Sequence, residues 1–518
     1  MSLPDISHLL AGTGAAGEND RWPALAARLR TIGLTGEYVA PLLAIGTGFS
    51  STLRAPVRMW HARRLQEPAG YAARLFLFQD RLTREEGKSV FGEGVGDGAF
   101  TRGLLDAGLV VKDADGSVRC PFQLQVTGPI FILCDVLKHG TDAVMGAAET
   151  TAALAVAGRP SHRAKRALDV GCGAGTVALL YAAECDLVVA TDISSRALAF
   201  ARVNARMNGV ANVEFREGDL FAPVAGETFD LIVSQPPFMP RVEGAAPTLY
   251  RDGGERGDEL PLRLMRELPA FLAPGGRAVV LVEWPVENAD EKALEARVRA
   301  AIANDELDVL LVQSPNASLD EFSIMYAATE HPELGEAYER AAIGWRGHFE
   351  KMNIKELKLT LNVISRPRTT GETGTAPHRG WTSTVVTRRF SDERATSERI
   401  QKMVEARDLL ARGDAAVLSA SLCITPGTSF TQQNAAGSAP TNEPLVLVQL
   451  PRDALIEPIA VNVQTYKLLQ MIDRAPSVRH ATQELSVAIK QSFEETAKKV
   501  LPAVSMGLRY GLLRSVAP

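Results

Sequence analysis

The stretch Ala167-Leu-Asp-Val-Gly-Cys-Gly-Ala-Gly-Thr176 decides the fold of this chain. An apolar strand pattern is followed by Gly171, Gly173 and Gly175, and a helical pattern begins at Thr176. Glycine suits such a loop because the chain turns sharply and its backbone can approach a ligand with no Cβ in the way. A strand that leads through glycines into a helix predicts a ligand-binding turn of a parallel α/β sheet.

Strand and helix patterns alternate from Arg166 to about Ser365, which predicts a Rossmann-like α/β fold with a parallel sheet. The predicted strands are Arg166–Val170, Leu187–Thr191, Val213–Arg216, Phe229–Ser234, Arg277–Glu283, Leu307–Gln313 and Glu356–Ile364. Open sheets of this kind bind ligands at the carboxyl ends of their strands. We therefore expect the site where the first strands end.

Acidic side chains stand at the ends of three consecutive predicted strands: Asp169, Asp192 and Asp219. A glycine loop alone could hold the pyrophosphate of a dinucleotide or bind nothing. The acids favour S-adenosylmethionine, with Asp169 near its ammonium group and Asp192 on the two ribose hydroxyls. Asp219 would accept from the adenine amine, and Leu220 would contact the base. We predict this cofactor.

The fourth predicted strand ends at Ser234, which we place in the cofactor site, and leads into Gln235-Pro236-Pro237-Phe238, the predicted catalytic motif. The prolines fix the turn and remove two backbone donors, so a carbonyl can face the acceptor. Phe238 can wall a pocket for a planar or cationic group. An ordinary Pro-Pro loop is the alternative, which the preceding cofactor pattern disfavours. A methyl transfer at this motif would depend mainly on alignment of donor and acceptor.

These residues together resemble the class I methyltransferases that carry an Asn-Pro-Pro-Tyr/Phe motif. That group includes the release-factor glutamine methyltransferases and several rRNA guanine and adenine N-methyltransferases. The resemblance continues through Leu249-Tyr-Arg-Asp-Gly-Gly254, Gly257-Asp258 and Leu272-Ala-Pro-Gly-Gly276. It implies a class I methyltransferase core that uses S-adenosylmethionine. More loosely, the chain resembles long bacterial proteins with a helical N-terminal extension, a segment like Gly140–Gly146 and a Trp-containing C-terminal extension.

Gln235 departs from the family's asparagine, because it carries the same amide one methylene further out. This change favours a methyltransferase whose acceptor is an amine or amide nitrogen, or another heteroatom such as a thioether sulfur, of an amino-acid-like small molecule. One alternative is a macromolecular acceptor, either a release-factor glutamine or an rRNA base nitrogen. Another is a protein that binds the cofactor without turnover. The acidic net charge leans toward the small acceptor and the extra modules toward the large one.

Tyr250, Asp258 and Glu283 are candidates to line the acceptor pocket. Each has an ordinary structural alternative: a loop hydroxyl, a helix cap and a strand-end acid, respectively. The histidines show no metal-ligand or catalytic-triad spacing, and we predict no metal site. Only His139, next to the segment Gly140–Gly146, is worth watching, and a plain loop histidine is favoured.

The flanking regions divide the chain into four predicted domains. Residues 1–110 form a helical, winged-helix-like domain, 111–165 a connector that covers the cofactor, 166–365 the methyltransferase domain and 366–518 a C-terminal extension that ends in a winged-helix-like bundle. Helical spacing marks Trp22–Ile32, Ala40–Leu43 and Leu75–Leu82, and a turn signal lies at Asp113–Gly116. Composition predicts a flexible crossing at Arg366–Thr384 and a mobile loop at Pro426–Pro444.

The 518 residues carry a net charge of -5, which gives no global attraction to nucleic acid or an anionic membrane. Five scattered cysteines without a CxxC pair fit a reducing compartment. We see neither a signal peptide nor an apolar stretch long enough to cross a membrane. We therefore expect a cytoplasmic protein without a membrane partner, and the sequence predicts no oligomeric state.

Overall fold

The computed structural model describes residues 3–10, 20–45, 51–136, 142–160, 162–243, 248–287, 291–314, 318–331, 334–367, 380–387, 395–433, 445–451, 456 and 458–516. The chain divides into two compact units. The first comprises Met1–Ala155, His162–Ala303 and Asn316–Thr360, and the second comprises Val156–Ser161, Asn304–Pro315 and Leu361–Pro518. The four domain boundaries expected from the sequence remain a prediction.

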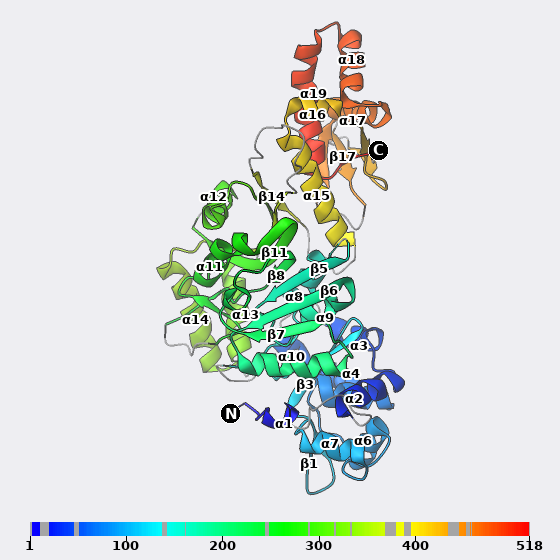
Figure 1. Cartoon of the computed structure of the whole chain (residues 1–518), viewed down its shortest axis with the longest axis vertical. Helices are drawn as coiled ribbons and strands as arrows, with labels where there is room; N and C mark the ends of the chain where they lie inside the picture. Colours follow the sequence, from blue (N-terminus) through cyan, green and yellow to red (C-terminus); the bar gives the residue numbers. More distant parts are fainter. Residues whose placement is uncertain are drawn as a thin grey trace. The chain divides into compact units, whose positions relative to one another are not determined.

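A twisted sheet with helices around it forms the core of the first unit (Figure 1). Its hydrogen-bonded strands follow the order β13-β11-β8-β5-β6-β7, and those from β11 to β7 run parallel. The strands are β5 (Ala164–Val170), β6 (Cys185–Asp192), β7 (Val213–Glu217), β8 (Phe229–Ser234), β11 (Leu272–Val286) and β13 (Glu356–Ser365). The predicted Rossmann-like α/β core is confirmed.

Helices and short strands complete this core. The helices are α9 (Thr176–Tyr181), α10 (Ser195–Met207), α11 (Glu259–Glu267), α12 (Glu291–Ile302), α13 (Leu319–Glu330) and α14 (Glu336–Lys351), with 3-10 turns at Ala182–Glu184, Ala222–Val224 and Leu268–Phe271. The short strand β9 (Met239–Pro240) follows β8 and pairs in parallel with β10 (Asp252–Gly254). The buried rings of Tyr326, Trp345 and Phe349 bring α13 and α14 together, and Met239 packs against them.

The predicted helical N-terminal region is also confirmed. It contains α1 (Ser7–Leu10), α2 (Arg21–Thr31), α3 (Gly36–Ala44), α4 (Ser51–Ala62), α5 (Pro68–Leu77), α6 (Arg84–Phe91), α7 (Ala99–Asp106) and, after two hairpins, α8 (Glu149–Ala157). The hairpin β1 (Val111–Lys112) and β2 (Val118–Arg119) follows α7, and Leu82 bridges to Val118. The helices α6 and α7 precede this hairpin, and the winged-helix-like character expected of the region remains a prediction. The pattern expected to be helical to Leu82 ends at Leu77, because the chain turns there into this bridge.

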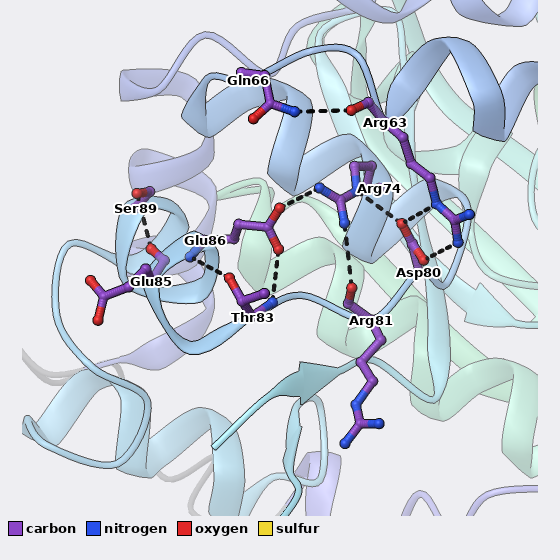
Figure 2. Close-up of polar contacts among 9 residues, drawn as sticks. All are labelled: Arg63, Gln66, Arg74, Asp80, Arg81, Thr83, Glu85, Glu86 and Ser89. Carbon is purple, nitrogen blue, oxygen red and sulfur yellow. Dashed lines mark hydrogen bonds and ion pairs between the residues drawn. The ribbon is translucent and has the colours of Figure 1, made fainter. Parts of the chain in front are cut away.

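Buried charges hold that turn between α5 and α6 (Figure 2). Arg74 donates to Asp80 at 2.9 Å and to Glu86 at 2.6 Å, and Arg63 donates to the other oxygen of Asp80 at 2.8 Å. Burial alone would raise the pKa of Asp80, but the hydrogen bonds and charges of the two arginines outweigh it and lower the pKa. Glu86 also closes a capping box with Thr83. The arginines of this region therefore include two that serve the fold.

A second hairpin, β3 (Phe122–Thr127) and β4 (Ile130–Asp135), joins the N-terminal helices to the sheet. The Asn204 side chain of α10 accepts from the Leu133 N–H at 2.8 Å and donates to the Leu133 carbonyl at 3.0 Å. Asn208, one helical turn later, accepts from the Phe131 N–H at 2.9 Å and donates to the Phe131 carbonyl at 2.7 Å. Two side-chain amides thus stand where a neighbouring strand would pair with β4.

The second unit contains β12 (Asp308–Gln313) and β14 (Thr382–Val386), which pair in parallel. Its helices are α15 (Ala395–Ala411), α16 (Asp414–Ser419), α17 (Val463–Arg474), α18 (Val478–Ile489) and α19 (Phe493–Arg509). Its remaining strands are β15 (Leu422–Ile424), β16 (Ser429–Gln433), β17 (Leu445–Gln449), β18 (Ile459–Asn462) and β19 (Leu513–Ser515). The predicted helical C-terminal region is confirmed, with its three last helices broken at Pro476 and Ser492.

Two stretches predicted to be irregular contain strands. The end of Arg366–Thr384 enters β14, and residues 429–433 of Pro426–Pro444 form β16, because backbone pairing overrides a weak local pattern there. Residues 368–379 and 434–444 of these stretches lie outside the described residues. Among the residues that the structure describes, no helix has both the length and the hydropathy to cross a membrane.

Candidate functional site

A cavity of about 700 Å³ lies at the carboxyl ends of β5, β6 and β8. Because these strands are neighbours and parallel, residues that follow each of them reach the same edge of the sheet. The residues predicted for cofactor binding and for the motif line this cavity together: Asp169, Gly171, Gly173, Asp192, Asp219, Leu220, Ser234, Gln235, Pro236, Pro237 and Phe238. Gly175 does not line it and serves the loop instead.

The glycine loop takes a backbone conformation that other residues avoid. Gly171, Gly173 and Gly175 have φ angles of 73°, 54° and 82°. A Cβ on Gly171 or Gly173 would meet no protein atom within 4 Å, whereas one on Gly175 would lie 3.1 Å from the Cβ of Ala201 in α10. The first two glycines therefore leave space for a ligand, and the third lets α9 and α10 pack closely.

Asp169 is the last residue but one of β5 and is 3% exposed. Burial raises the pKa of its carboxyl to about 7, against a hydrogen bond of 3.0 Å from the Ala178 N–H that lowers it. The negative charge of Asp192 raises the pKa further. A buried carboxyl of this kind is suited to gain a cationic partner, since a nearby positive charge favours the ionised form.

Asp192 at the end of β6 is held by the backbone through both oxygens. One accepts from the Gly173 N–H and the other from the Ser194 N–H, each at 2.8 Å. Its side chain is half-buried, and burial raises the pKa of the carboxyl despite these bonds. The fixed carboxylate keeps lone pairs for two adjacent hydroxyls, as the sequence predicted for a ribose.

Asp219 follows β7 and forms an ion pair of 2.7 Å with Arg263 of α11. The sequence pattern missed this partner, which lies far along the chain. Leu220 has a φ of 44°, and its carbonyl accepts from the Thr191 hydroxyl at 3.2 Å. The ion pair with Arg263 uses one oxygen of Asp219. The expected contact between Asp219 and an adenine amine remains a prediction.

Ser234 and Gln235 diverge at the end of β8. The buried Ser234 hydroxyl donates to the Val170 carbonyl at 2.8 Å, so this side chain ties β8 to β5. The Gln235 amide instead meets two threonines at the start of α8: its Nε2 donates to the Thr150 hydroxyl at 2.9 Å, and its Oε1 accepts from the Thr151 hydroxyl at 3.3 Å. Local sequence around the motif gave no signal for these partners.

Gly253 and Gly257 lie close against the backbone of the Pro-Pro-Phe turn. A Cβ on Gly253 would lie 2.7 Å from the Phe238 Cα and 2.2 Å from the Gly257 carbonyl oxygen. A Cβ on Gly257, whose φ is 94°, would lie 2.5 Å from the Phe238 carbonyl oxygen. Gly253 and Gly257 are therefore required by close packing at the motif.

The three candidate acceptor residues have different surroundings. Tyr250 lines the cavity, and burial raises the pKa of its hydroxyl. Asp258 is 2% exposed at the start of α11 and is ion-paired with Arg297. Glu283 is 6% exposed and accepts from the Tyr326 hydroxyl, and burial raises its pKa to about 7. The structure brings Tyr250 to the cavity and places Asp258 and Glu283 away from its lining.

The connector also contributes to the cavity, through Asp142–Gly146. The Val144 N–H donates to the Asp135 carboxylate at 2.9 Å, the Asp135 N–H donates to the Val144 carbonyl at 3.0 Å, and Arg196 of α10 is ion-paired with Asp135. This segment is thereby attached to both β4 and the core. His139, Gly140 and Thr141 lie outside the described residues.

Comparison with known proteins identifies this region. Residues 148–294 match the family model "Methyltransferase small domain". The chain is 40% identical over 142 residues to a release factor glutamine methyltransferase of Deinococcus radiodurans, covering 26% of the chain and 50% of that protein. Residues 148–294 are thus similar to a class I methyltransferase domain.

A second relative is a ribosomal protein uL3 glutamine methyltransferase of Bradyrhizobium diazoefficiens, 34% identical over 24% of the chain and 43% of that protein. The chain thus spans about half the length of these relatives. A solved ribosomal protein L11 methylase from Lactobacillus delbrueckii is 18% identical over 43% of the chain and 82% of its own, but its TM-score of 0.26 is too low to bear on function.

The relatives correct one expectation. The extra methylene of Gln235 and the acidic net charge led us to favour a small-molecule acceptor, and that prediction is wrong. Both of these relatives are named for the methylation of glutamine in a protein. Net charge averages over the whole surface, so it says little about the chemistry of one cavity.

The cofactor is S-adenosylmethionine, and the cavity fits it. Gly171 and Gly173 leave open space at the cavity wall, which the backbone loop needs to approach a ligand. The buried Asp169 suits the ammonium group, and the backbone-held Asp192 suits the ribose hydroxyls. Phe238 and Tyr250 line the same cavity.

Proposed function

We propose that this chain methylates the side-chain amide nitrogen of a glutamine in a protein. The observation that carries the proposal is the Gln-Pro-Pro-Phe turn in one cavity with the glycine loop. The names of the curated relatives support glutamine as the acceptor residue and a protein as the partner.

The residues of the motif would act by orientation. Bound S-adenosylmethionine supplies a methyl group on a sulfonium that needs no further activation. Gln235 Oε1 has a second lone pair, which can accept an N–H from the acceptor amide. Phe238 would pack on the planar amide group, and the turn would hold the nitrogen in line with the methyl group. After transfer the nitrogen loses one of its two protons, so a secondary amide forms.

The test uses tritiated S-adenosylmethionine and a lysate of source cells from which the gene has been deleted. Addition of the purified chain should label a polypeptide, and mass spectrometry of its peptides should place one added methyl group on a glutamine. Asp192→Ala is the matched control, because it removes the carboxylate that would bind the ribose of the cofactor and should abolish the label. Label confined to RNA or to small molecules would refute a protein glutamine acceptor.

A further inference from the structure

The amide of Gln235 is bound at both of its ends by one short segment of the N-terminal region. Thr150 and Thr151 are consecutive residues in the first turn of α8, and both line the same cavity as Gln235. The two bonds run in opposite directions: Nε2 donates to Thr150, and Oε1 accepts from Thr151. Because each end of the amide is bound to a hydroxyl, turning the amide out of this plane would break both bonds.

The length of the side chain matters for this arrangement. An asparagine at position 235 would hold its amide one carbon–carbon bond closer to the backbone, and therefore further from α8. Glutamine has one more rotatable bond, so its amide has more orientations to lose. An asparagine amide would be restricted in its orientation by its shorter side chain. For Gln235, the two threonine hydroxyls restrict the orientation of the amide. One lone pair of Oε1 remains for an acceptor.

The start of α8 is itself held in place. The Tyr181 hydroxyl of α9 donates to the carbonyls of Leu154 and Ala155, at 3.2 and 2.9 Å. Glu149 forms an ion pair of 3.7 Å with Arg54 of α4. The helix that carries the threonines is thus anchored to α9, which begins directly after the glycine loop, and to the N-terminal helices.

We propose that Thr150 and Thr151 are positioning residues that orient the Gln235 amide for the acceptor, a role that rests on the proposed methyl transfer. Gln235 touches the acceptor, and the threonines act through Gln235. The N-terminal region then contributes to catalysis through the first turn of α8. The glutamine and the two threonines form one unit, in which the longer side chain is useful only because α8 meets it.

The first experiment detects the bonds without any acceptor. In protein labelled with nitrogen-15 in its glutamine side chains, the Gln235 amide signals are those missing from Gln235→Ala. Thr150→Val should shift these signals, and Thr329→Val, which removes an exposed hydroxyl bonded within α13, should leave them unchanged. Unmoved Gln235 signals in Thr150→Val would overturn the proposal, whatever the protein methylates.

The second experiment measures turnover with the acceptor protein that the labelling experiment identifies. Thr150→Val and Thr151→Val should each lower kcat about tenfold while the Kd for S-adenosylmethionine stays constant, and Thr151→Ser should restore the rate. In a Gln235→Asn background the valine substitutions should change nothing further, because the shorter amide does not reach the hydroxyls. Equal losses in both backgrounds would show a merely structural role and overturn the proposal.

The two failures are distinguishable. If the parent chain labels no protein glutamine, the proposed function fails while the amide signals still report on the threonines. If the parent is active and the valine variants keep its kcat, the proposed function stands and the positioning role is refuted.

Discussion

Lowering the pH from about 8 to about 6 should weaken the binding of S-adenosylhomocysteine, the demethylated product, about tenfold through Asp169. Burial raises the pKa of this carboxyl to about 7 in the free protein, the Ala178 N–H opposes the shift, and Asp192 adds to it. The ligand's ammonium group interacts favourably with the carboxylate and not with the neutral acid. Between these pH values the ionised fraction of a group with a pKa near 7 falls about tenfold, and the apparent affinity falls with it.

Titration calorimetry of the parent and of Asp169→Asn tests this reasoning. The asparagine variant should bind more weakly near pH 8, and its affinity should not follow the parent's decline toward pH 6. Below pH 7 the parent should also release a proton on binding, which appears as a dependence of the measured heat on the buffer. If both proteins lost affinity in parallel as the pH fell, the pH dependence would belong to another group and the assignment of Asp169 would be refuted.

Three further perturbations follow from buried contacts. The pKa of Glu283 is raised from 4.5 to about 7, so the stability that its neutral form contributes is present below pH 4.5 and is lost as the pH rises through 7. In urea unfolding, the stability of Glu283→Gln should therefore increase by about 3 kcal/mol relative to the parent between pH 4.5 and pH 7. A difference that does not change with pH would contradict the burial argument. Asn204→Ala leaves two carbonyls and an N–H of the interior unpaired and should cost about 3 kcal/mol of unfolding free energy, against little for the exposed Gln66→Ala; similar costs would show that the amide is dispensable. Gly253→Ala should displace the motif and lower kcat more than tenfold at constant cofactor affinity, whereas Gly344→Ala, which faces open space, should keep full activity; an active Gly253→Ala would place the motif's geometry elsewhere.

The sequence predicted the parts of the molecule that depend on consecutive residues. The seven expected strands all form, because each has its apolar residues in a short run or in alternation with polar ones. The residues from Asp169 to Gly175 could be assigned because strand, loop and helix follow one another directly. The cofactor was predictable for the same reason.

Contacts between distant residues could not be predicted in this way. Thr150 lies 85 positions from Gln235, and nothing near either residue marks the pair. Asp258 and Glu283 are acids near strand and helix ends, so they matched the pattern of pocket residues, yet each is bound by a partner on another helix. A periodic pattern shows which residues face the interior and does not show which of them meet.

The acceptor was misjudged because a single side chain was considered without its surroundings. One extra methylene at position 235 moves an amide, and we read that as a change of substrate. The structure places the amide against α8, so the same substitution is compatible with the acceptor of the relatives.

Asn204 of α10 and Asn208 at its C-cap also cover an open edge of β4. The backbone of β4 is bonded on the side away from β3: the Phe131 N–H donates to Asn208, the Leu133 N–H donates to Asn204, and the Asp135 N–H donates to the Val144 carbonyl. An open strand edge is a template on which another chain can add a strand and begin to aggregate. A chain cut within the connector would keep the hairpin but lose the helix that covers it. Fragments of this protein that retain β3 and β4 without α10 should therefore be prone to self-association, however well their own helices fold.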